Sequence, residues 1–313
     1  MTFGMMTMHI VRMKNITALI ALIFSPIILA AESNSLERRT KFIVYDNNNA
    51  ETFVSTSQND NLKNALADCL PSCNYSLVVH GWSESCKTPW AENLRENLIK
   101  ERGGCIICMD YSDYSSDYGY LVNNFRQISK ILTNKLETLK RLGFSSESAY
   151  LFGFSYGARR FDKEIKIILS CRFTIPVCEP AGPSFDNKKN ADPKMAAINS
   201  QCIHTASGGF GTRERSCHQN WLMGKCGESQ IAQRPFPNGN HGLCPQFYNS
   251  AFNNVFAAVE KEKTCRQPIN ERDATDLPSD KVIRMGFHQN IYNNSKLNVV
   301  NLYAMTSQAY PFN

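Results

Sequence analysis

The stretch AYLFGFSYGARR, residues 149–160, predicts a buried strand that turns sharply into a helix. Apolar residues lead into the pattern G-x-S-x-G at positions 153–157, and a helical pattern follows over residues 156–170. In such a turn the glycines leave room for the neighbouring strand and helix, and the serine hydroxyl is held out at the end of the strand. We therefore predict that Ser155 is a nucleophile, with a surface serine in an ordinary tight turn as the alternative.

Short apolar runs alternate with helical patterns on both sides of this turn, which predicts an α/β fold with a mostly parallel central sheet flanked by helices. The chain has 313 residues, of which 42% are hydrophobic, and it contains no internal repeat or Gly/Ser linker, so we expect one domain over residues 32–313. The predicted strands cover residues 41–45, 76–80, 105–110, 149–153, 173–178 and 298–305, and the predicted helices cover residues 90–101, 121–142, 156–170 and 245–262.

A catalytic serine needs a base, and the base needs an acid that orients it. After a nucleophile in this kind of turn, the acid precedes the histidine along the chain. The next predicted strand ends at Glu179, 24 residues beyond Ser155 (179 − 155), which leaves room for one helix and one strand. Glu179 is therefore the predicted acid and Asp186 the second choice, while a surface carboxylate in a Pro-rich loop is the non-catalytic interpretation.

Four histidines follow Glu179 in the sequence, and we predict that His241 is the base. It lies in a loop rich in Pro, Gly and Asn just before a predicted helix, from which a side chain can reach across to Ser155. The other three lie at a predicted strand end, in a Cys-rich segment and near the last strand, and they stay alternatives: His204, His218 and His288.

Two backbone N–H groups are needed to bind the oxyanion that forms during acyl transfer. The turn after Ser155 aims the Tyr156 N–H at that position. The second donor is expected in the loop after an early strand, where SLVVH at residues 76–80 is followed by Gly-Trp. We predict the Trp82 N–H as this donor, with His80 supporting the loop, and an ordinary β-turn with a buried Trp as the alternative.

The N-terminal residues predict a secretory signal peptide over residues 1–31. Two basic residues precede an apolar run at residues 16–29, and two alanines follow at 30–31. The run is short and contains Pro26, which disfavours a membrane span, and a retained signal anchor is the alternative. The protein is therefore expected to be secreted and extracellular.

Twelve cysteines, an even number, fit that compartment and predict disulfides whose pairing the sequence leaves open. Cys105 and Cys108 form a C-x-x-C, but they lie in an apolar strand pattern with no second such pair in the chain, so zinc or redox chemistry is disfavoured. Asn74 and Asn293 are candidate N-glycosylation sites.

The charge pattern excludes some partners. The formal net charge of +6 is modest, and the Lys and Arg residues are scattered, so no nucleic-acid partner is expected. The small basic excess is compatible with transient contact with a membrane or lipid surface. No metal or organic cofactor is implied, and the oligomeric state is left open.

Together these motifs resemble the animal lipase family, which contains pancreatic lipase, the insect and wasp-venom phospholipases A1 and the yolk proteins of flies. The resemblance spans residues 41–312 and is closest to the insect lipase and phospholipase A1 branch. It rests on matches to the family's strand-plus-HG(W/F) segment, its G-H-S-L-G-A-H turn, its L-D-P-A-G-P acid motif and its V-I-H-T strand: LVVHGW at 77–82, GFSYGAR at 153–159, CEPAGP at 178–183 and CIHT at 202–205.

The resemblance implies an α/β-hydrolase fold without the C-terminal β-sandwich domain of pancreatic-type lipases. It implies a carboxylic ester hydrolase that acts on lipid esters or small esters, of lipase or phospholipase A1 type, through an acyl-enzyme. Carried over to this chain, Ser155 is the nucleophile, Glu179 takes the place of the usual Asp, and Trp82 and Tyr156 supply the oxyanion donors. The family's base follows a C-S motif, whereas His241 is followed by Cys244 instead.

The segment at residues 226–244 stands where triglyceride lipases of the family have a long lid closed by a disulfide. It is short, which favours phospholipids or soluble esters over bulk triglyceride. Five residues depart from the family pattern: Phe154, Tyr156, Arg159, Arg160 and Glu179. The second hypothesis is therefore a protein that keeps the fold, has lost catalysis and serves in lipid binding, storage or partner binding. An unrelated disulfide-rich binding module is disfavoured by the α/β pattern.

Overall fold

The computed structural model describes residues 35–46, 48–55, 59–69, 74–160, 174–186, 193–197, 199–232, 239–256, 258–259, 284–288 and 300–313. The predicted signal peptide and the candidate glycosylation site at Asn293 lie outside these residues. Within the described part of the chain, no helix combines the length and the apolar composition that crossing a bilayer requires.

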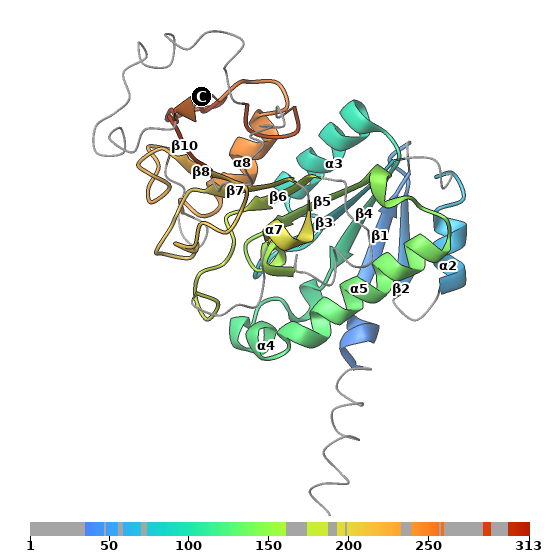
Figure 1. Cartoon of the computed structure of the whole chain (residues 1–313). Helices are drawn as coiled ribbons and strands as arrows, with labels where there is room; N and C mark the ends of the chain where they lie inside the picture. Colours follow the sequence, from blue (N-terminus) through green and yellow to red (C-terminus); the bar gives the residue numbers. More distant parts are fainter. Residues whose placement is uncertain are drawn as a thin grey trace, which may run out of the picture.

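A twisted sheet forms the centre of the described fold, with the strand order β2-β1-β4-β3-β5-β6-β7-β8-β10-β9 (Figure 1). Strands β4, β3, β5, β6, β7, β8 and β10 are parallel, while β1 and β9 run antiparallel to their neighbours. The strands are β1 (Lys41–Tyr45), β2 (Glu51–Ser55), β3 (Tyr75–Val79), β4 (Cys105–Asp110), β5 (Ala149–Phe154), β6 (Thr174–Cys178), β7 (Asn199–His204), β8 (Gln219–Met223), β9 (Ala258–Val259) and β10 (Val300–Ala304). The carboxyl ends of the parallel strands therefore share one edge of the sheet.

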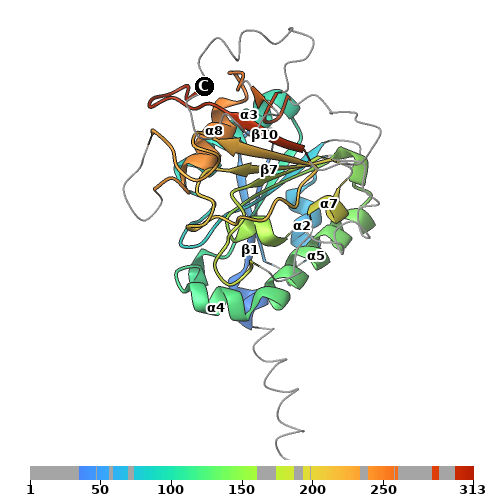
Figure 2. The same cartoon turned by 60° about the vertical axis from the view of Figure 1, so that its left-hand side comes forward.

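Helices cover both faces of the sheet (Figures 1 and 2). On one face lie α2 (Asn59–Ala65), α5 (Phe125–Arg141) and α7 (Pro193–Ala196), and on the other α3 (Pro89–Arg102) and α8 (Leu243–Ser250). Strand side chains alternate between the two resulting cores: Phe42 and Val44 belong to the first and Ile43 and Tyr45 to the second. Burial on both faces explains why the strands are continuous apolar runs in the sequence.

One predicted helix is two helices in the structure. The pattern over residues 121–142 divides into α4 (Tyr118–Asn123) and α5, with Asn124 between them. Both the backbone N–H and the side-chain Nδ2 of Asn124 donate to the Tyr120 carbonyl at 3.0 Å. This local capping ends α4 although the apolar periodicity continues into α5.

The helix predicted at residues 245–262 is wrong for the described residues after Ser250, where α8 ends. Asn254 Nδ2 donates to the Ser250 carbonyl at 3.1 Å, and Ala258–Val259 joins the sheet as β9 beside β10. Pairing with a distant strand overrides the local helical pattern here. Strands β2 and β8 were not predicted, because ETFVS and QNWLM lack a continuous apolar run. Of the helix predicted at 156–170, the structure describes only the short 3-10 turn Gly157–Arg160.

The cysteine pairs connect the loops to the sheet. The described disulfides are Cys69–Cys105, Cys86–Cys108, Cys178–Cys244 and Cys202–Cys217. The two members of the C-x-x-C pair with different partners because positions three apart in a strand point to opposite faces. Nowhere in the described ranges do three or more His, Cys, Asp or Glu side chains gather as they would around a metal ion. Cys244 bonds to Cys178, so the two ends of the short 226–244 segment are not bonded to each other.

Candidate active site

Ser155 lies in a strained turn directly after β5. Its φ is 54°, in the left-handed region, and its N–H donates to the Cys178 carbonyl at 2.9 Å. A Cβ on Gly157 would lie 2.4 Å from the His80 carbonyl oxygen and 2.5 Å from that of Val79, so only glycine fits beside the end of β3. The glycine of the motif is therefore required by the neighbouring strand, as the sequence predicts.

His241 reaches Ser155 from the loop before α8. Its Nε2 lies 2.8 Å from the serine Oγ, a hydrogen bond between residues 86 positions apart. The rings of Phe154 and Phe210 pack against the imidazole with centroid distances of 5.1 and 5.8 Å. Burial lowers the pKa of His241 to about 3. The ring is therefore neutral at pH 7, the state in which Nε2 can accept the serine proton.

The other histidines lie elsewhere. His204 is buried at the end of β7, with Nδ1 3.2 Å from Arg215. His218 lies 3.0 Å from the Ser200 hydroxyl, and His288 is exposed 3.8 Å from Glu101. Of the four candidates, the described structure brings only His241 to the serine.

Glu179 follows β6 in a turn with φ 41°, and its carboxyl is fully buried. Oε2 accepts hydrogen bonds from the Thr205 N–H, from the Thr205 hydroxyl at 2.6 Å and from the Ala206 N–H at 2.8 Å. Within the described residues, neither the second oxygen, Oε1, nor Nδ1 of His241 has a hydrogen-bond partner. These are the two atoms that a catalytic triad would join, and the structure does not join them directly.

Burial raises the pKa of Glu179 to about 7, although its hydrogen bonds with Thr205 and Ala206 favour the charged form. Space for its side chain depends on Gly211. A Cβ there would lie 1.6 Å from Oε1 of Glu179, and the φ of Gly211 is not in the left-handed region. The glycine is thus required by the longer acidic side chain and not by its own backbone conformation.

Asp186, the second candidate acid, has other partners. Its Oδ1 accepts from Arg159 at 3.2 Å and from the Thr212 hydroxyl. Arg159 also donates to the Ala181 carbonyl at 2.7 Å and to Glu214 at 2.9 Å. The arginine that is unusual at this position of the turn therefore links the turn to the two loops after β6 and β7, and Asp186 takes part in that linkage.

The predicted oxyanion donors are available. Among the described residues, the backbone N–H groups of Trp82 and Tyr156 have no hydrogen-bond acceptor. The loop after β3 passes close to the nucleophile, since a Cβ on Gly81 would lie 3.1 Å from the Ser155 Cβ. Two unpaired N–H groups next to a serine hydroxyl can stabilise the negative charge of a tetrahedral intermediate.

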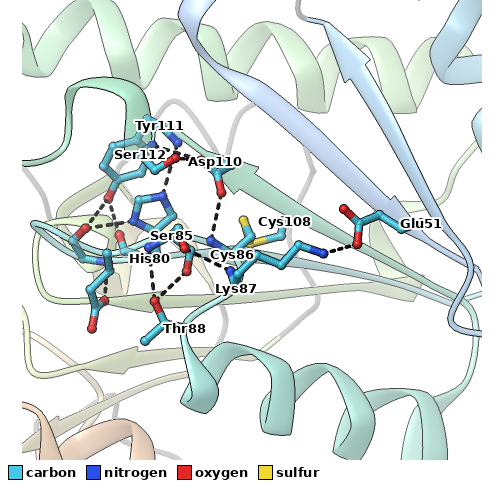
Figure 3. Close-up of a disulfide and its surroundings, with 12 residues drawn as sticks. Glu51, His80, Ser85, Cys86, Lys87, Thr88, Cys108, Asp110, Tyr111 and Ser112 are labelled. Carbon is cyan, nitrogen blue, oxygen red and sulfur yellow. Dashed lines mark hydrogen bonds and ion pairs between the residues drawn. A yellow bond between two sulfur atoms is a disulfide. The ribbon is translucent and has the colours of Figure 1, made fainter.

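A network behind this loop holds it in place (Figure 3). The Cys86–Cys108 disulfide joins the loop to β4, and the Cys86 N–H donates to Asp110 Oδ2 at 2.9 Å. The His80 ring stacks on Tyr111 at 3.9 Å, and its Nε2 accepts from the Tyr111 N–H at 3.2 Å. Burial lowers the pKa of His80 to about 4, so this support is a neutral ring. These contacts are those expected if His80 supports the loop, as the sequence predicts.

Sequence reasoning missed Glu84, a half-buried carboxyl in the same loop. Its Oε2 accepts from the Gly81 N–H at 2.9 Å, and its Oε1 accepts from the Trp90 indole N–H at 3.0 Å. Burial raises the pKa of Glu84 to about 7. A single Glu in a loop carries no periodic or motif signal, so only the folded arrangement identifies it.

A mostly apolar pocket of about 250 Å³ opens over Ser155 and His241. It accommodates an apolar group next to the nucleophile, which fits the acyl part of an ester. The remaining lining residues are Trp82, Ser83, Glu84, Tyr118, Phe154, Ala181, Pro183 and Phe210.

The parallel sheet, the serine in a left-handed turn at its carboxyl edge and the histidine that reaches that serine define an α/β-hydrolase fold. The family model described as Lipase matches residues 17–222, about two thirds of the chain, and the chain belongs to this lipase family. The family predicted from the sequence motifs is confirmed at this level.

Two curated relatives are similar over part of the chain. Lipase member H of Danio rerio is 24% identical over 155 residues, covering 46% of this chain and 33% of that protein. Pancreatic triacylglycerol lipase of Oryctolagus cuniculus is 27% identical over 127 residues, covering 38% and 26%. The match thus spans about a third or less of these relatives' length. Among solved structures, the Pyrococcus furiosus esterase Pf2001 has a partial likeness, with 12% identity, a TM-score of 0.33 and coverage of 46% of this chain and 66% of that one.

Proposed function

We propose that this protein is a secreted carboxylic ester hydrolase that acts on lipid esters, of lipase or phospholipase A1 type. The observation that carries the proposal is the 2.8 Å hydrogen bond between Ser155 Oγ and Nε2 of a neutral His241. A serine hydroxyl that donates to a neutral imidazole is the starting arrangement for nucleophilic attack on an ester carbonyl.

In the proposed reaction, Ser155 Oγ attacks the ester carbonyl carbon while His241 Nε2 takes the serine proton. The Trp82 and Tyr156 N–H groups hold the oxyanion of the tetrahedral intermediate. His241 then gives the proton to the leaving alcohol, and an acyl-enzyme forms on Ser155. Water, deprotonated by His241, attacks the acyl carbonyl, and His241 returns this proton to Ser155 Oγ as the bond between Oγ and the acyl carbon breaks and the acid product leaves.

Glu179 is the proposed acid that orients His241. Its unpaired Oε1 and the unpaired Nδ1 of the histidine support this role, since each is a buried polar atom that lacks a partner within the described residues. A buried polar atom without a partner is costly, so a change that joins the two is favourable. We propose that they join in the substrate complex, either directly or through one water molecule.

The pocket supports an ester with an apolar acyl group. Apart from Ser155, His241 and Glu84, its lining is made mainly of Trp82, Tyr118 and other aromatic or small residues. The short segment before His241 favours phospholipids or soluble esters over bulk triglyceride, and transient contact with a lipid surface accompanies that preference. Secretion is proposed from the N-terminal sequence.

A second candidate is a lipase-fold protein that binds or stores lipid without hydrolysis. The specific observation in its favour is that Glu179 makes no hydrogen bond with His241. In this case the apolar pocket is a binding site and Ser155 is a remnant of an ancestral nucleophile.

The test is fatty-acid release from phosphatidylcholine, a triglyceride and a short-chain p-nitrophenyl ester by wild type and Ser155→Ala side by side. The enzyme proposal expects hydrolysis by wild type and its loss in the variant, with labelling of Ser155 by a fluorophosphonate probe. A folded wild type that hydrolyses none of the three and takes up no probe would establish the binding protein instead.

A further inference from the structure

The Cys178–Cys244 disulfide lies between the two chain segments that carry the proposed acid and base. Cys178 is the last residue of β6, directly before Glu179, and Cys244 lies in the first turn of α8, three residues after His241. The Cys244 N–H donates to the His241 carbonyl at 3.4 Å. One covalent bond therefore fixes the backbone next to both groups, across 66 positions of sequence.

Several described anchors of α8 lie toward its carboxyl end, while just before the helix the Gln230 N–H donates to Asn240 Oδ1 at 3.2 Å. Phe247 packs against Phe312 at 5.3 Å, the Tyr248 hydroxyl bonds to that of Tyr150, and Asn249 Nδ2 donates to the Trp90 carbonyl at 2.9 Å. At the amino end, Gly242 supplies no side-chain cap. Buried Leu243 packs there, and Cys178–Cys244 is the described disulfide that reaches this helix.

The imidazole itself has few restraints. Its described polar contact is the one with Ser155, and Nδ1 has no partner within the described residues. In a site where an acid already bonds Nδ1, that bond fixes the orientation of the ring. Here the place of the ring depends on ring packing with Phe154 and Phe210 and on where the backbone before α8 is held.

We propose that the Cys178–Cys244 disulfide is a positioning device for His241, holding the amino end of α8 against β6 so that Nε2 stays within hydrogen-bond distance of Ser155 Oγ. This inference rests on the proposed hydrolase function. A shift of about 1 Å in a reacting group can lower a rate by roughly a hundredfold. Opening this disulfide therefore lowers the rate of the chemical step much more than it lowers substrate binding.

The test compares two double variants that each remove one disulfide. Cys178→Ala/Cys244→Ala removes the proposed device. Cys69→Ala/Cys105→Ala is the matched control, because Cys105 begins β4 at the amino ends of the parallel strands, away from Ser155. On a short-chain p-nitrophenyl ester, we expect kcat to fall by about 10- to 100-fold in the first variant with KM changed less than about twofold, and to stay near wild type in the control.

A second measurement separates this proposal from the proposed function, because it needs no activity. The pKa of His241 is followed by NMR in wild type and both variants, with His241→Gln for assignment. Burial holds this pKa at about 3, so a ring released toward water returns toward 6.5. We expect the pKa of His241 to rise in Cys178→Ala/Cys244→Ala alone. The neighbouring carboxyls, Glu84 after β3 and Glu179 after β6, are present in wild type and in both variants, so they do not account for a difference between them.

The outcomes are distinct. If wild type hydrolyses no ester, the proposed function fails, and the NMR titration still decides the positioning role. The positioning role is overturned if Cys178→Ala/Cys244→Ala keeps the wild-type kcat and the wild-type pKa of His241. It is also overturned if the control variant shows equal changes. If the first variant does not fold, stepwise reduction of the native protein with alkylation mapping replaces it. Loss of activity that tracks alkylation of Cys244 is then expected, and loss that tracks Cys69 or Cys105 instead contradicts the proposal.

Discussion

At the scale of single residues, one departure of the proposed site from the family pattern is its acidic side chain, and the neighbouring residues accommodate the difference. Glu179 is one methylene longer than the Asp that the resemblance implies. Its carboxyl is received by Thr205 and Ala206, and Gly211 leaves the space that the second oxygen occupies. The residues around Glu179 therefore accommodate its longer side chain.

We expect Glu179→Gln to lower kcat/KM by several orders of magnitude while the protein stays folded, because a neutral amide cannot stabilise an imidazolium at His241. The measurement is ester hydrolysis together with thermal unfolding. Asp186→Asn is the control, since Asp186 contacts Arg159 and Thr212. Near-wild-type turnover in Glu179→Gln and a loss in Asp186→Asn would exchange the roles of the two acids.

Gly211→Ala should displace the Glu179 carboxyl, since the added Cβ would meet Oε1 at 1.6 Å. Overpacking of this kind costs about 1–3 kcal/mol of unfolding free energy, and we expect activity to fall with it. Gly209→Ala is the matched control in the same loop, because its nearest neighbour would be the Ala206 carbonyl oxygen at 3.5 Å. Urea unfolding and ester hydrolysis are measured for both, and an equal effect of the two changes would contradict the argument.

At the scale of elements, the turn after β5 is tied to the loops around it by one buried arginine. Arg159 bonds the Ala181 carbonyl, Asp186 and Glu214, and its side chain is 4% exposed. The oxyanion loop after β3 is held in a comparable way by Asp110 and the Cys86–Cys108 disulfide. The loops that form the site are thus each fastened to the rigid sheet.

Removing the arginine should loosen the turn and the loops together. We expect Arg159→Met to lower the free energy of unfolding by about 2–3 kcal/mol, somewhat less than a fully buried pair because Asp186 and Glu214 are partly exposed. Lys100→Met is the control, since the Lys100–Glu101 pair lies at the surface and such pairs contribute about 0–1 kcal/mol. Urea unfolding measures both, and similar small losses would show that Arg159 does not fasten these loops.

At the scale of the whole molecule, buried titrating groups act on stability in opposite directions. His80, His204 and His241 have pKa values lowered by burial, so the unfolded chain binds more protons as the pH falls below 6.5, and stability is lost. Glu84 and Glu179 have pKa values raised to about 7, so they favour the folded state at low pH and lose that contribution as the pH rises from 4.5 to 7.

Below pH 4.5 the two carboxyls are protonated in both states, while the histidines and Asp110, whose pKa is lowered, still respond, so we expect stability to fall steeply there. As the pH rises from 4.5 to 7, Glu84 in wild type lowers the free energy of unfolding by an amount on the order of 3 kcal/mol, because its pKa is raised from 4.5 to about 7 in the folded state. We expect Glu84→Gln to lack this pH-dependent decrease. Urea unfolding at several pH values tests this, with Glu96→Gln on the exposed side of α3 as control. A stability difference between wild type and Glu84→Gln that is the same at every pH would refute it.

The sequence alone predicted the α/β class, the sheet's central strands and the turn at Ser155, because each depends on neighbouring residues: apolar runs, their period and glycines at a fixed spacing. It also predicted His241 as the histidine nearest the serine, from a loop followed by a helix. These local patterns predict the observed structure because strand burial and turn geometry depend on only a few neighbouring residues.

The remaining features arise from contacts between residues far apart in the chain. No local signal indicates the disulfide pairs, the hydrogen bond of Glu84 with Trp90, the ion pair of Asp186 with Arg159 or the end of α8 at Ser250. Each depends on which segments the sheet places next to one another. The free energies of burial and of pairing that favour one contact over another arise only when those segments come together. Sequence spacing placed Glu179 before Asp186 as the candidate acid, and the residues that contact each of them in the structure distinguish the two.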